Sequence, residues 1–234
     1  MLEVIGLSAG YGRIPVLRDI RLNCAANTCV GVLGRNGMGK TTLLRALMGE
    51  IPAMAGSLHF DGEDLSRAAA HQRARAGIGY VPQGRQIFPF LSVRENLRMG
   101  CVKDFAKADA TIERILAYFP RLQRLLDQPG GALSGGEQQL LALARCLCGE
   151  PNIILLDEPT EGIQPSICDE IIETLQRLRV EQNLAVILVE QDIEFLSALS
   201  NRILIIENGQ LVDEVDPAHT SAEAIAERFM GFHA

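Results

Sequence analysis

The chain lacks the features of a membrane-spanning, targeted or zinc-clustered protein. Its longest apolar runs, such as "IILL" and "LAVILV", fall far short of the roughly 20 residues that a helix needs to cross a bilayer. The N-terminal "MLEVIGLSAG" has no positive region followed by a long apolar stretch, so we expect no targeting segment. The 6 cysteines form no CxxC pair and the 4 histidines do not cluster. We therefore expect no zinc site. We also expect the cysteines to be reduced, mostly buried and cytosolic.

An excess of positive charge is also missing. The formal net charge of -7 argues against a sequence-independent grip on nucleic acid, so no nucleic-acid partner is expected, although local basic patches could bind phosphate. Low-complexity tracts and internal repeats are absent as well. With 47% hydrophobic and 22% charged residues over 234 positions, the chain is long enough and apolar enough to fold as one large or two small domains.

Strands alternate with helices along most of the chain, which predicts an α/β fold with a mostly parallel sheet and helices on both faces. "NIILLDEP" and "LAVILVE" are continuous apolar runs, as expected of strands covered on both sides. Helical periodicity dominates residues 92–149. We interpret approximately 84–149 as a helical subdomain inserted into a core of residues 1–83 and 150–234, within a single domain spanning 1–234.

A glycine-rich loop follows the buried strand "CVGVLG" and precedes an amphipathic helix. Residues Gly34 to Thr41 fit the phosphate-binding pattern G-x-x-x-x-G-K-[ST]. Glycines let backbone N–H groups face phosphate oxygens, and the helix dipole adds positive potential. Lys40 is expected at the β- and γ-phosphates and Thr41 at magnesium. A chance glycine turn is the alternative, which the strand–loop–helix context disfavours. The predicted nucleotide contacts are Gly34, Asn36, Gly37, Gly39, Lys40, Thr41 and Thr42.

Two acids end the apolar strand "IILLDEP". One such acid can hold hydrated magnesium while the next polarises an attacking water, which suits Asp157 as the metal ligand and Glu158 as the catalytic group. Asp-Glu-Pro is also ordinary strand-to-loop sequence. Only the combination with the phosphate-binding loop makes the chemical interpretation strong.

The segment "LSGGEQQ" begins a helix in which Ser134 and Glu137 fit a capping box. Gly135 and Gly136 have no side chains to cover the backbone N–H groups at the helix N-terminus, which favours anion binding there. One chain would then carry two anion-binding helix ends. Two copies paired head-to-tail could close them over a single nucleotide.

Together, "GRNGMGKTT", "YVPQG", "LSGGEQQ" and "LLDEPTEG" resemble the ATP-binding subunits of ABC transporters over essentially the whole chain. The resemblance implies a P-loop ATPase core with an N-terminal antiparallel β part and a helical signature subdomain. It implies ATP and Mg2+ as cofactors, with two nucleotides held between two such subunits. It also implies transmembrane permease subunits as partners and a peripheral position on the cytoplasmic face of the bacterial inner membrane.

Further site residues follow from the same resemblance. Tyr11 matches the aromatic that stacks on adenine, with a hairpin-core aromatic as the alternative. Gln83 matches the glutamine that touches magnesium and the attacking water. The alternative is that it is simply a polar residue at the end of a strand. The signature residues expected at the γ-phosphate of the opposite subunit are Ser134, Gly135, Gly136 and Glu137. The segment "GRQIFPFLSVREN" after Gln83 would meet the permease, unless Phe88 and Phe90 are buried in the subdomain core.

Two positions depart from the commonest pattern of this family. Gln191 stands where most such subunits have histidine, and Gln164 where an aspartate is usual. We predict that Gln191 contacts the γ-phosphate and adds no titration near neutral pH. "LVEQ" and "GIGYVPQGRQIFP" resemble ATPases of branched-chain amino-acid and amide importers, and "DEPTEGIQPSI" resembles the urea-import members most. That branch implies a periplasmic solute-binding protein and a second, identical or different ATPase.

Three alternatives to an importer ATPase stay open. Loss of the histidine could mark a nucleotide switch with little turnover, although Lys40, Gln83, Asp157 and Glu158 complete the hydrolytic set. An exporter subunit is possible because import rests on subfamily resemblance alone. A DNA-repair or ribosome-associated member is disfavoured by the short gap between Gly39 and Ser134, the single ATP-binding domain and the acidic balance.

Overall fold

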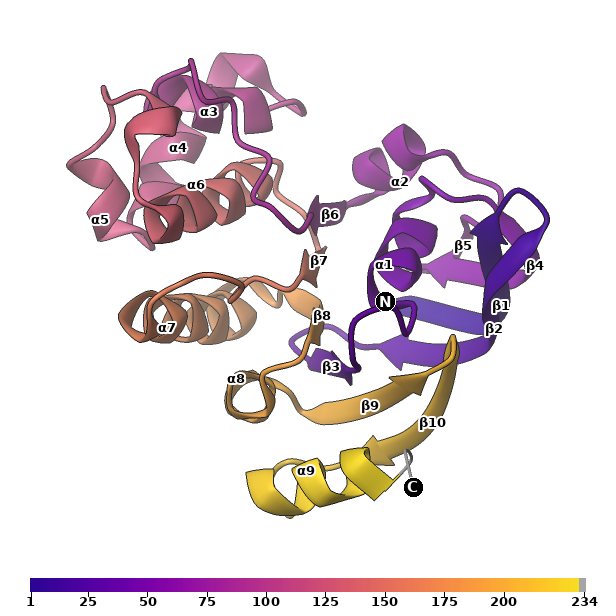
Figure 1. The fold of residues 1–234 in the computed structure, drawn as a ribbon. Helices are drawn as coiled ribbons and strands as arrows, with labels where there is room; N and C mark the ends of the chain where they lie inside the picture. Colours follow the sequence, from indigo (N-terminus) through magenta and orange to yellow (C-terminus); the bar gives the residue numbers. More distant parts are fainter. Residues whose placement is uncertain (232–234) are drawn as a thin grey trace.

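The computed structural model describes residues 1–231, so residues 232–234 of the predicted core lie outside the described part of the chain. Its central sheet has six strands in the order β10-β9-β3-β8-β7-β6 (Figure 1). All neighbours are parallel except β9 and β10, which form a hairpin with its turn at Asn208-Gly209, where both residues have positive φ. The strands are β3 (Cys29–Leu33), β6 (Ile78–Val81), β7 (Ile153–Asp157), β8 (Ala185–Glu190), β9 (Arg202–Glu207) and β10 (Gln210–Val215).

A second sheet is antiparallel and comes from the N-terminal part of the chain, as expected for the fold class. Its strand order is β2-β1-β4-β5. The strands are β1 (Leu2–Tyr11), β2 (Ile14–Cys24), β4 (Ala53–Phe60) and β5 (Glu63–Asp64). The turn between β4 and β5 falls at Asp61-Gly62, and both residues have positive φ. In this part, the sequence also forms α2 (Ala70–Ala76), a helix that we did not predict.

Two apolar cores explain why the central strands are apolar throughout. In β7, Ile153 and Leu155 face a core shared with the antiparallel sheet and helix α1 (Lys40–Met48). Ile154 and Leu156 face the opposite core. Successive side chains point to opposite faces of a strand, so both faces of β7 are buried. This second core includes α7 (Pro165–Gln182), α8 (Ile193–Leu199) and α9 (Ala222–Gly231).

The chain between β6 and β7 is helical and stands apart from the antiparallel sheet (Figure 1). Ser92 caps α3 with a capping box, in which Glu95 accepts from the Ser92 backbone N–H at 2.7 Å. The helices here are α3 (Val93–Gly100), α4 (Ala108–Leu116), α5 (Pro120–Gln123) and α6 (Gly135–Leu147), with short 3-10 turns η1 (Phe105–Lys107) and η2 (Gly130–Ala132). Within residues 1–231, no helix combines the length and apolarity needed to span a bilayer.

Candidate functional site

The glycine-rich loop lies where β3 ends and α1 begins. Gly39 is the N-cap of α1 with φ 103°, a left-handed conformation that favours glycine. The Lys40 side chain folds back and donates to the Gly34 carbonyl at 2.7 Å. Lys40 is only 4% exposed, so its ammonium group is fixed inside the loop. The predicted strand–loop–helix arrangement is therefore present, with the loop at the carboxyl edge of the parallel sheet.

Asp157 ends β7 next to this loop. Thr41 Oγ1 donates to Asp157 Oδ1 at 3.1 Å, and the Tyr80 hydroxyl donates to Oδ2 at 3.2 Å. Burial raises the pKa of Asp157, and the nearby charge of Glu158 raises it further, while both hydrogen bonds lower it. Burial also raises the pKa of Tyr80, with the Asp157 charge as a second cause. Tyr80 was not among the predicted site residues.

Glu158 faces both the phosphate-binding loop and Gln83. Its Oε1 pairs with Lys40 Nζ at 2.8 Å, and its Oε2 accepts from Gln83 Nε2 at 3.3 Å. Gln83 donates more closely to Glu161, at 2.9 Å. Glu158 has φ 45°, an uncommon conformation for a non-glycine residue, and its N–H donates to Val189 of β8 at 3.0 Å. The sheet therefore holds this backbone turn in place.

Gln191 follows β8, the neighbour of β7 in the sheet. Its side chain is exposed, and Nε2 donates to Asn36 Oδ1 in the glycine-rich loop at 3.0 Å. The structure thus brings Gln191 to the same edge as Lys40 and Asp157. Its contact with a γ-phosphate stays a prediction.

Glu190 is a buried acid whose structural role the sequence analysis missed. It is 3% exposed and accepts hydrogen bonds from the Thr160 and Gln191 N–H groups at 3.0 and 2.8 Å. The Thr160 hydroxyl donates to the same carboxylate. Glu190 therefore joins the loop after Glu158 to the loop that carries Gln191. An acid at the end of an otherwise apolar strand was the available signal.

The predicted signature helix is α6, and its capping box is confirmed. Glu137 accepts from the Ser134 N–H and hydroxyl at 2.8 and 2.7 Å, and these bonds lower the pKa of Glu137. Gly135 and Gly136 form the first residues of the helix. Figure 1 shows α6 among the helices between β6 and β7, away from α1. One chain therefore separates its two candidate phosphate-binding helix ends.

Two further predicted positions lie at the surface. Tyr11 ends β1 and is 48% exposed, so it is not the hairpin-core aromatic of the alternative. Its hydroxyl accepts from Arg45 of α1 at 3.4 Å, and the Arg45 guanidinium lies 6.0 Å from its ring centroid. Gln164 is exposed at the N-cap of α7.

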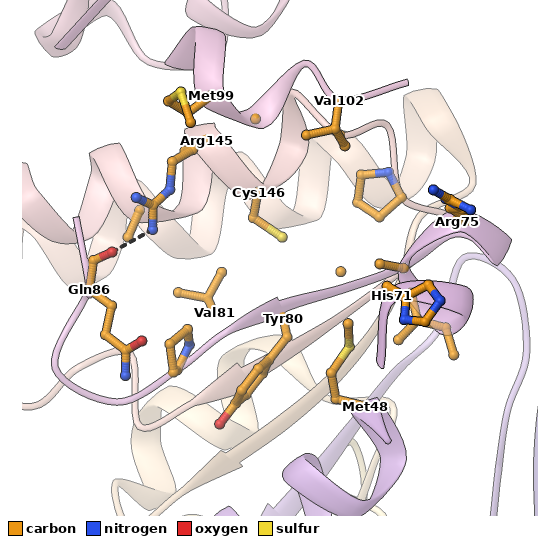
Figure 2. A pocket seen from close by; sticks show the side chains of 18 of the residues that line it. Met48, His71, Arg75, Tyr80, Val81, Gln86, Met99, Val102, Arg145 and Cys146 are labelled. Atoms are coloured by element: carbon orange, nitrogen blue, oxygen red, sulfur yellow. Dashed lines mark hydrogen bonds between the residues drawn. The ribbon is translucent and has the colours of Figure 1, made fainter. Parts of the chain in front are cut away.

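A groove of about 1000 Å³ lies between the β6 side of the core and helices α3 and α6. Figure 2 shows Met99, Val102, Arg145 and Cys146 on one wall and Tyr80 on the other. Phe90, just beyond the groove-lining Phe88, is 96% exposed, and Phe88 is 42% exposed. Neither residue is buried in the subdomain core, which excludes that alternative.

Carboxylate and hydroxyl oxygens at the loop suit magnesium. Thr41 and Asp157 present hard oxygen atoms beside Lys40, and Mg2+ in phosphate-binding loops is commonly held by one or two protein oxygens together with phosphates and water. Within the described residues, no group of three or more His, Cys, Asp or Glu is arranged to hold a metal by itself. The donor set thus fits a metal that arrives with a nucleotide.

A phosphate-binding loop, a buried acid pair and a parallel sheet that joins them define a P-loop nucleotide-binding protein. The family model described as "ABC transporter" matches residues 17–161. The chain is 38% identical over 213 residues to the high-affinity branched-chain amino acid transport ATP-binding protein BraG of Pseudomonas aeruginosa, covering 91% of each protein. The chain belongs to the ABC transporter family, as an ATP-binding subunit that hydrolyses ATP.

Other relatives include a second branched-chain amino acid transport protein and a lipopolysaccharide export protein. The chain is 32% identical to the probable branched-chain amino acid transport ATP-binding protein LivF of Archaeoglobus fulgidus, covering 90% of each. It is 34% identical to the lipopolysaccharide export ATP-binding protein LptB of Escherichia coli, covering 92% of this chain and 90% of LptB.

Solved structures share the same fold. A nucleotide-free ATP-binding cassette from an ABC transporter superposes with a TM-score of 0.88 at 20% identity, covering 100% of this chain and 98% of that one. The cbiO1 protein of Clostridium perfringens, part of an ABC transporter complex, has a TM-score of 0.84 at 26% identity, covering 98% and 92%. These likenesses bear out the predicted fold class.

Proposed function

We propose that the chain uses ATP hydrolysis to drive uptake of a small polar solute through a membrane permease. The observation that carries this proposal is the convergence of Lys40, Asp157, Glu158 and Gln83 at one edge of the sheet. Thr41 contacts Asp157 and Lys40 contacts Glu158, while Gln83 donates to Glu158. A chain that only bound nucleotide would not need a buried glutamate beside the phosphate-binding lysine.

In this proposal the residues work mainly by position and charge. The backbone of Gly34 to Gly39 and the ammonium group of Lys40 hold the phosphates. Glu158 orients a water molecule and accepts its proton, since its carboxylate lies at the loop and its backbone is fixed by β8. Gln83 donates to Glu158 and so keeps that carboxylate oriented.

Thr41 and Asp157 would hold Mg2+, with Gln83 as a further ligand. The ion would neutralise negative charge on the phosphates. The hydrogen bond from Thr41 to Asp157 brings the two oxygens together, which supports a shared cation. Tyr11 would stack on adenine and is exposed enough to do so.

A second ATP-binding subunit would complete the site. Ser134, Gly135 and Gly136 lie in a helical region apart from the glycine-rich loop of the same chain (Figure 1). A head-to-tail pair would bring the α6 N-terminus of one subunit to the phosphates held by the other. The N–H groups at this helix end and its dipole favour an anion there.

The groove supports docking of a permease segment and a peripheral place at the cytoplasmic face of the membrane. Its walls combine apolar side chains with basic ones, so they suit an amphipathic segment that carries acidic residues. The basic lining residues proposed to meet that segment are Arg75, Lys103 and Arg145, with Glu50 and His71 beside them.

Two methionines offer a matched test of this docking. Met99 lies in the groove and is 49% exposed, whereas Met54 lies on β4 and is 44% exposed. Met99→Glu should sharply reduce co-purification with the permeases, and Met54→Glu should not. Equal co-purification of both variants with the permeases would remove the groove from the interface.

The solute has two candidates within the importer group. The loop sequence "DEPTEGIQPSI" favours urea or a short amide. The named relatives BraG and LivF favour branched-chain amino acids. Uptake into vesicles by the complete transporter, with its periplasmic solute-binding protein, should distinguish labelled urea from leucine. Uptake of neither, with outward movement of another substrate, would favour the exporter alternative raised by LptB.

A further inference from the structure

A left-handed turn follows Gln83 and fixes the direction of Arg85. Gly84, Arg85 and Gln86 have φ of 79°, 67° and 47° in succession. Only glycine adopts such values without steric cost, so two of the three residues are held in a disfavoured conformation. Such backbone persists where the surrounding structure imposes it.

Arg145 of α6 provides that constraint. Its Nη2 donates to the Gln86 carbonyl at 2.7 Å, and the guanidinium lies 5.0 Å from the Phe88 ring centroid. Figure 2 shows this bond crossing from α6 to the segment after β6. The turn is therefore attached to the same helix whose N-terminus carries Ser134.

The turn directs the Arg85 side chain toward two glycines. A Cβ atom at Gly135 would lie 3.0 and 3.1 Å from Arg85 Nη2 and Nη1, and a Cβ at Gly162 would lie 3.7 Å from Nη2. Arg85 thus lies against the first residue of α6 and beside the loop after Glu158. A Cβ atom at Gly135 would be in tight contact with the guanidinium, which would have to shift by a few tenths of an ångström, so glycine lets Arg85 lie close to the helix.

The Arg85 guanidinium has no hydrogen bond or ion pair within residues 1–231, although it is partly buried. The acidic side chains of the adjoining segments each have another partner: Glu137 is bonded to Ser134, Glu158 to Lys40, and Glu161 to Gln83. A helix N-terminus carries positive potential, so an unpaired cation beside it is disfavoured. The arrangement becomes favourable when an anion joins both groups.

We propose that Arg85 donates hydrogen bonds to the phosphate chain of the ATP held by a second copy of this chain. This inference rests on the proposed two-subunit site, in which the α6 N-terminus meets that nucleotide. Closure of the pair removes water from Arg85, and a buried guanidinium requires an anionic partner. Arg85 therefore adds a charged contact to those expected from Ser134 and Gly136.

The test measures ATP-driven dimerisation in a Glu158→Gln parent, where slowed hydrolysis preserves the nucleotide-bound pair. Sedimentation with Mg2+ and ATP gives the dimer dissociation constant, and a fluorescent ATP analogue gives the nucleotide affinity of dilute monomers. Arg85→Gln should raise the dimer dissociation constant by about 10-fold or more, because charge-assisted hydrogen bonds are lost at both sites. The dimer dissociation constant of Arg85→Lys should lie between those of the parent and Arg85→Gln, since lysine keeps the charge but loses the planar donor group.

Arg67→Gln is the charge-matched control, because Arg67 is exposed between β5 and α2. Its dimer constant should stay within about 2-fold of the parent, as for most surface substitutions. An unchanged constant in Arg85→Gln, or an equal loss in Arg67→Gln, would overturn the role of Arg85. An equal loss of monomer nucleotide affinity in Arg85→Gln would place its effect within its own subunit and also overturn it. Failure of the Glu158→Gln parent itself to dimerise with ATP would overturn the two-subunit site, and Arg85 with it.

Discussion

Lys40 and Glu158 form an ion pair inside the protein. Lys40 Nζ lies 2.8 Å from Glu158 Oε1, and the two side chains are 3% and 7% exposed. Lys40 also donates to the Gly34 carbonyl, so its ammonium group is shared between the glycine-rich loop and the acid. Burying both charges is costly, and removing one leaves the other without a charged partner. The pair thus ties the proposed phosphate contact to the proposed water-orienting group.

Glu158→Gln should abolish most turnover while ATP binding persists. The amide keeps the shape of the side chain but cannot accept a proton from water, so the rate of phosphate release should fall by about 10²- to 10⁴-fold. Phosphate release with Mg2+ and the affinity for a fluorescent ATP analogue measure the two properties. Glu161→Gln is the control, since Glu161 also accepts from Gln83 but lies exposed. Equal phosphate release from parent and Glu158→Gln would instead support a nucleotide switch.

Gln191→Ala should lower turnover and largely preserve ATP binding. Gln191 donates to Asn36 at 3.0 Å, so its amide is oriented at the phosphate-binding loop, and alanine removes both that bond and the proposed γ-phosphate contact. A fall in kcat with little change in KM is expected, since the lost contact would strengthen as hydrolysis proceeds. Unchanged turnover would make Gln191 a simple edge residue.

Gln191→His should introduce a pH dependence that the parent lacks at this position. An amide does not titrate near neutral pH, whereas an imidazole has an ordinary pKa of about 6.5. Turnover of the variant should therefore show an added transition near that pH. Rate profiles of parent and variant, measured side by side, provide the comparison, and superimposable profiles would contradict the placement of this side chain at the reacting phosphate.

Glu190→Ala should reduce both stability and turnover. The substitution leaves the Thr160 and Gln191 N–H groups without their acceptor, which should cost about 1–3 kcal/mol of unfolding free energy. Urea denaturation measures this loss. Glu190→Gln should fall between parent and alanine variant, because its amide keeps one oxygen acceptor. A Glu190→Ala protein as stable as the parent would show that these bonds contribute nothing.

Features encoded within one short segment could be predicted from the sequence. Contacts between segments far apart in the chain could not. The loop Gly34 to Thr41 carries its chemistry within one short segment, and the capping box of Ser134 and Glu137 spans only one helical turn. The buried strands β7 and β8 were equally evident, because their apolar character runs without interruption.

Tertiary contacts alone reveal the roles of Tyr80, Glu190 and Arg85. Tyr80 reaches Asp157 because β6 pairs with β7, a register that the sequence does not state. The direction of Arg85 depends on three successive left-handed residues and on a bond from distant α6. Helix α2 was overlooked because "AHQRARA" is short and has little apolar periodicity.

Asp157→Asn should lose ATP turnover but raise the unfolding free energy of the nucleotide-free protein. Burial raises the pKa of Asp157 above its ordinary value of 3.8, so the folded state binds its proton more tightly than the unfolded state does. Folding stability from this group therefore falls as pH rises from 3.8 through the raised pKa, and the full cost persists above it. Asparagine carries no charge to desolvate and avoids that cost.

The unfolding free energy of Asp157→Asn should thus improve relative to the parent as pH rises from 3.8 through the raised pKa of Asp157, and the gain should level off above that pKa. Urea denaturation across this range measures the difference. A difference that stays constant, or that favours the parent as pH rises, would contradict the effect of burial. With Mg2+ and ATP the order should reverse, because only the parent keeps the carboxylate proposed to hold the ion. Bound ligand then stabilises the parent by mass action, and thermal unfolding with and without Mg2+ separates the two contributions.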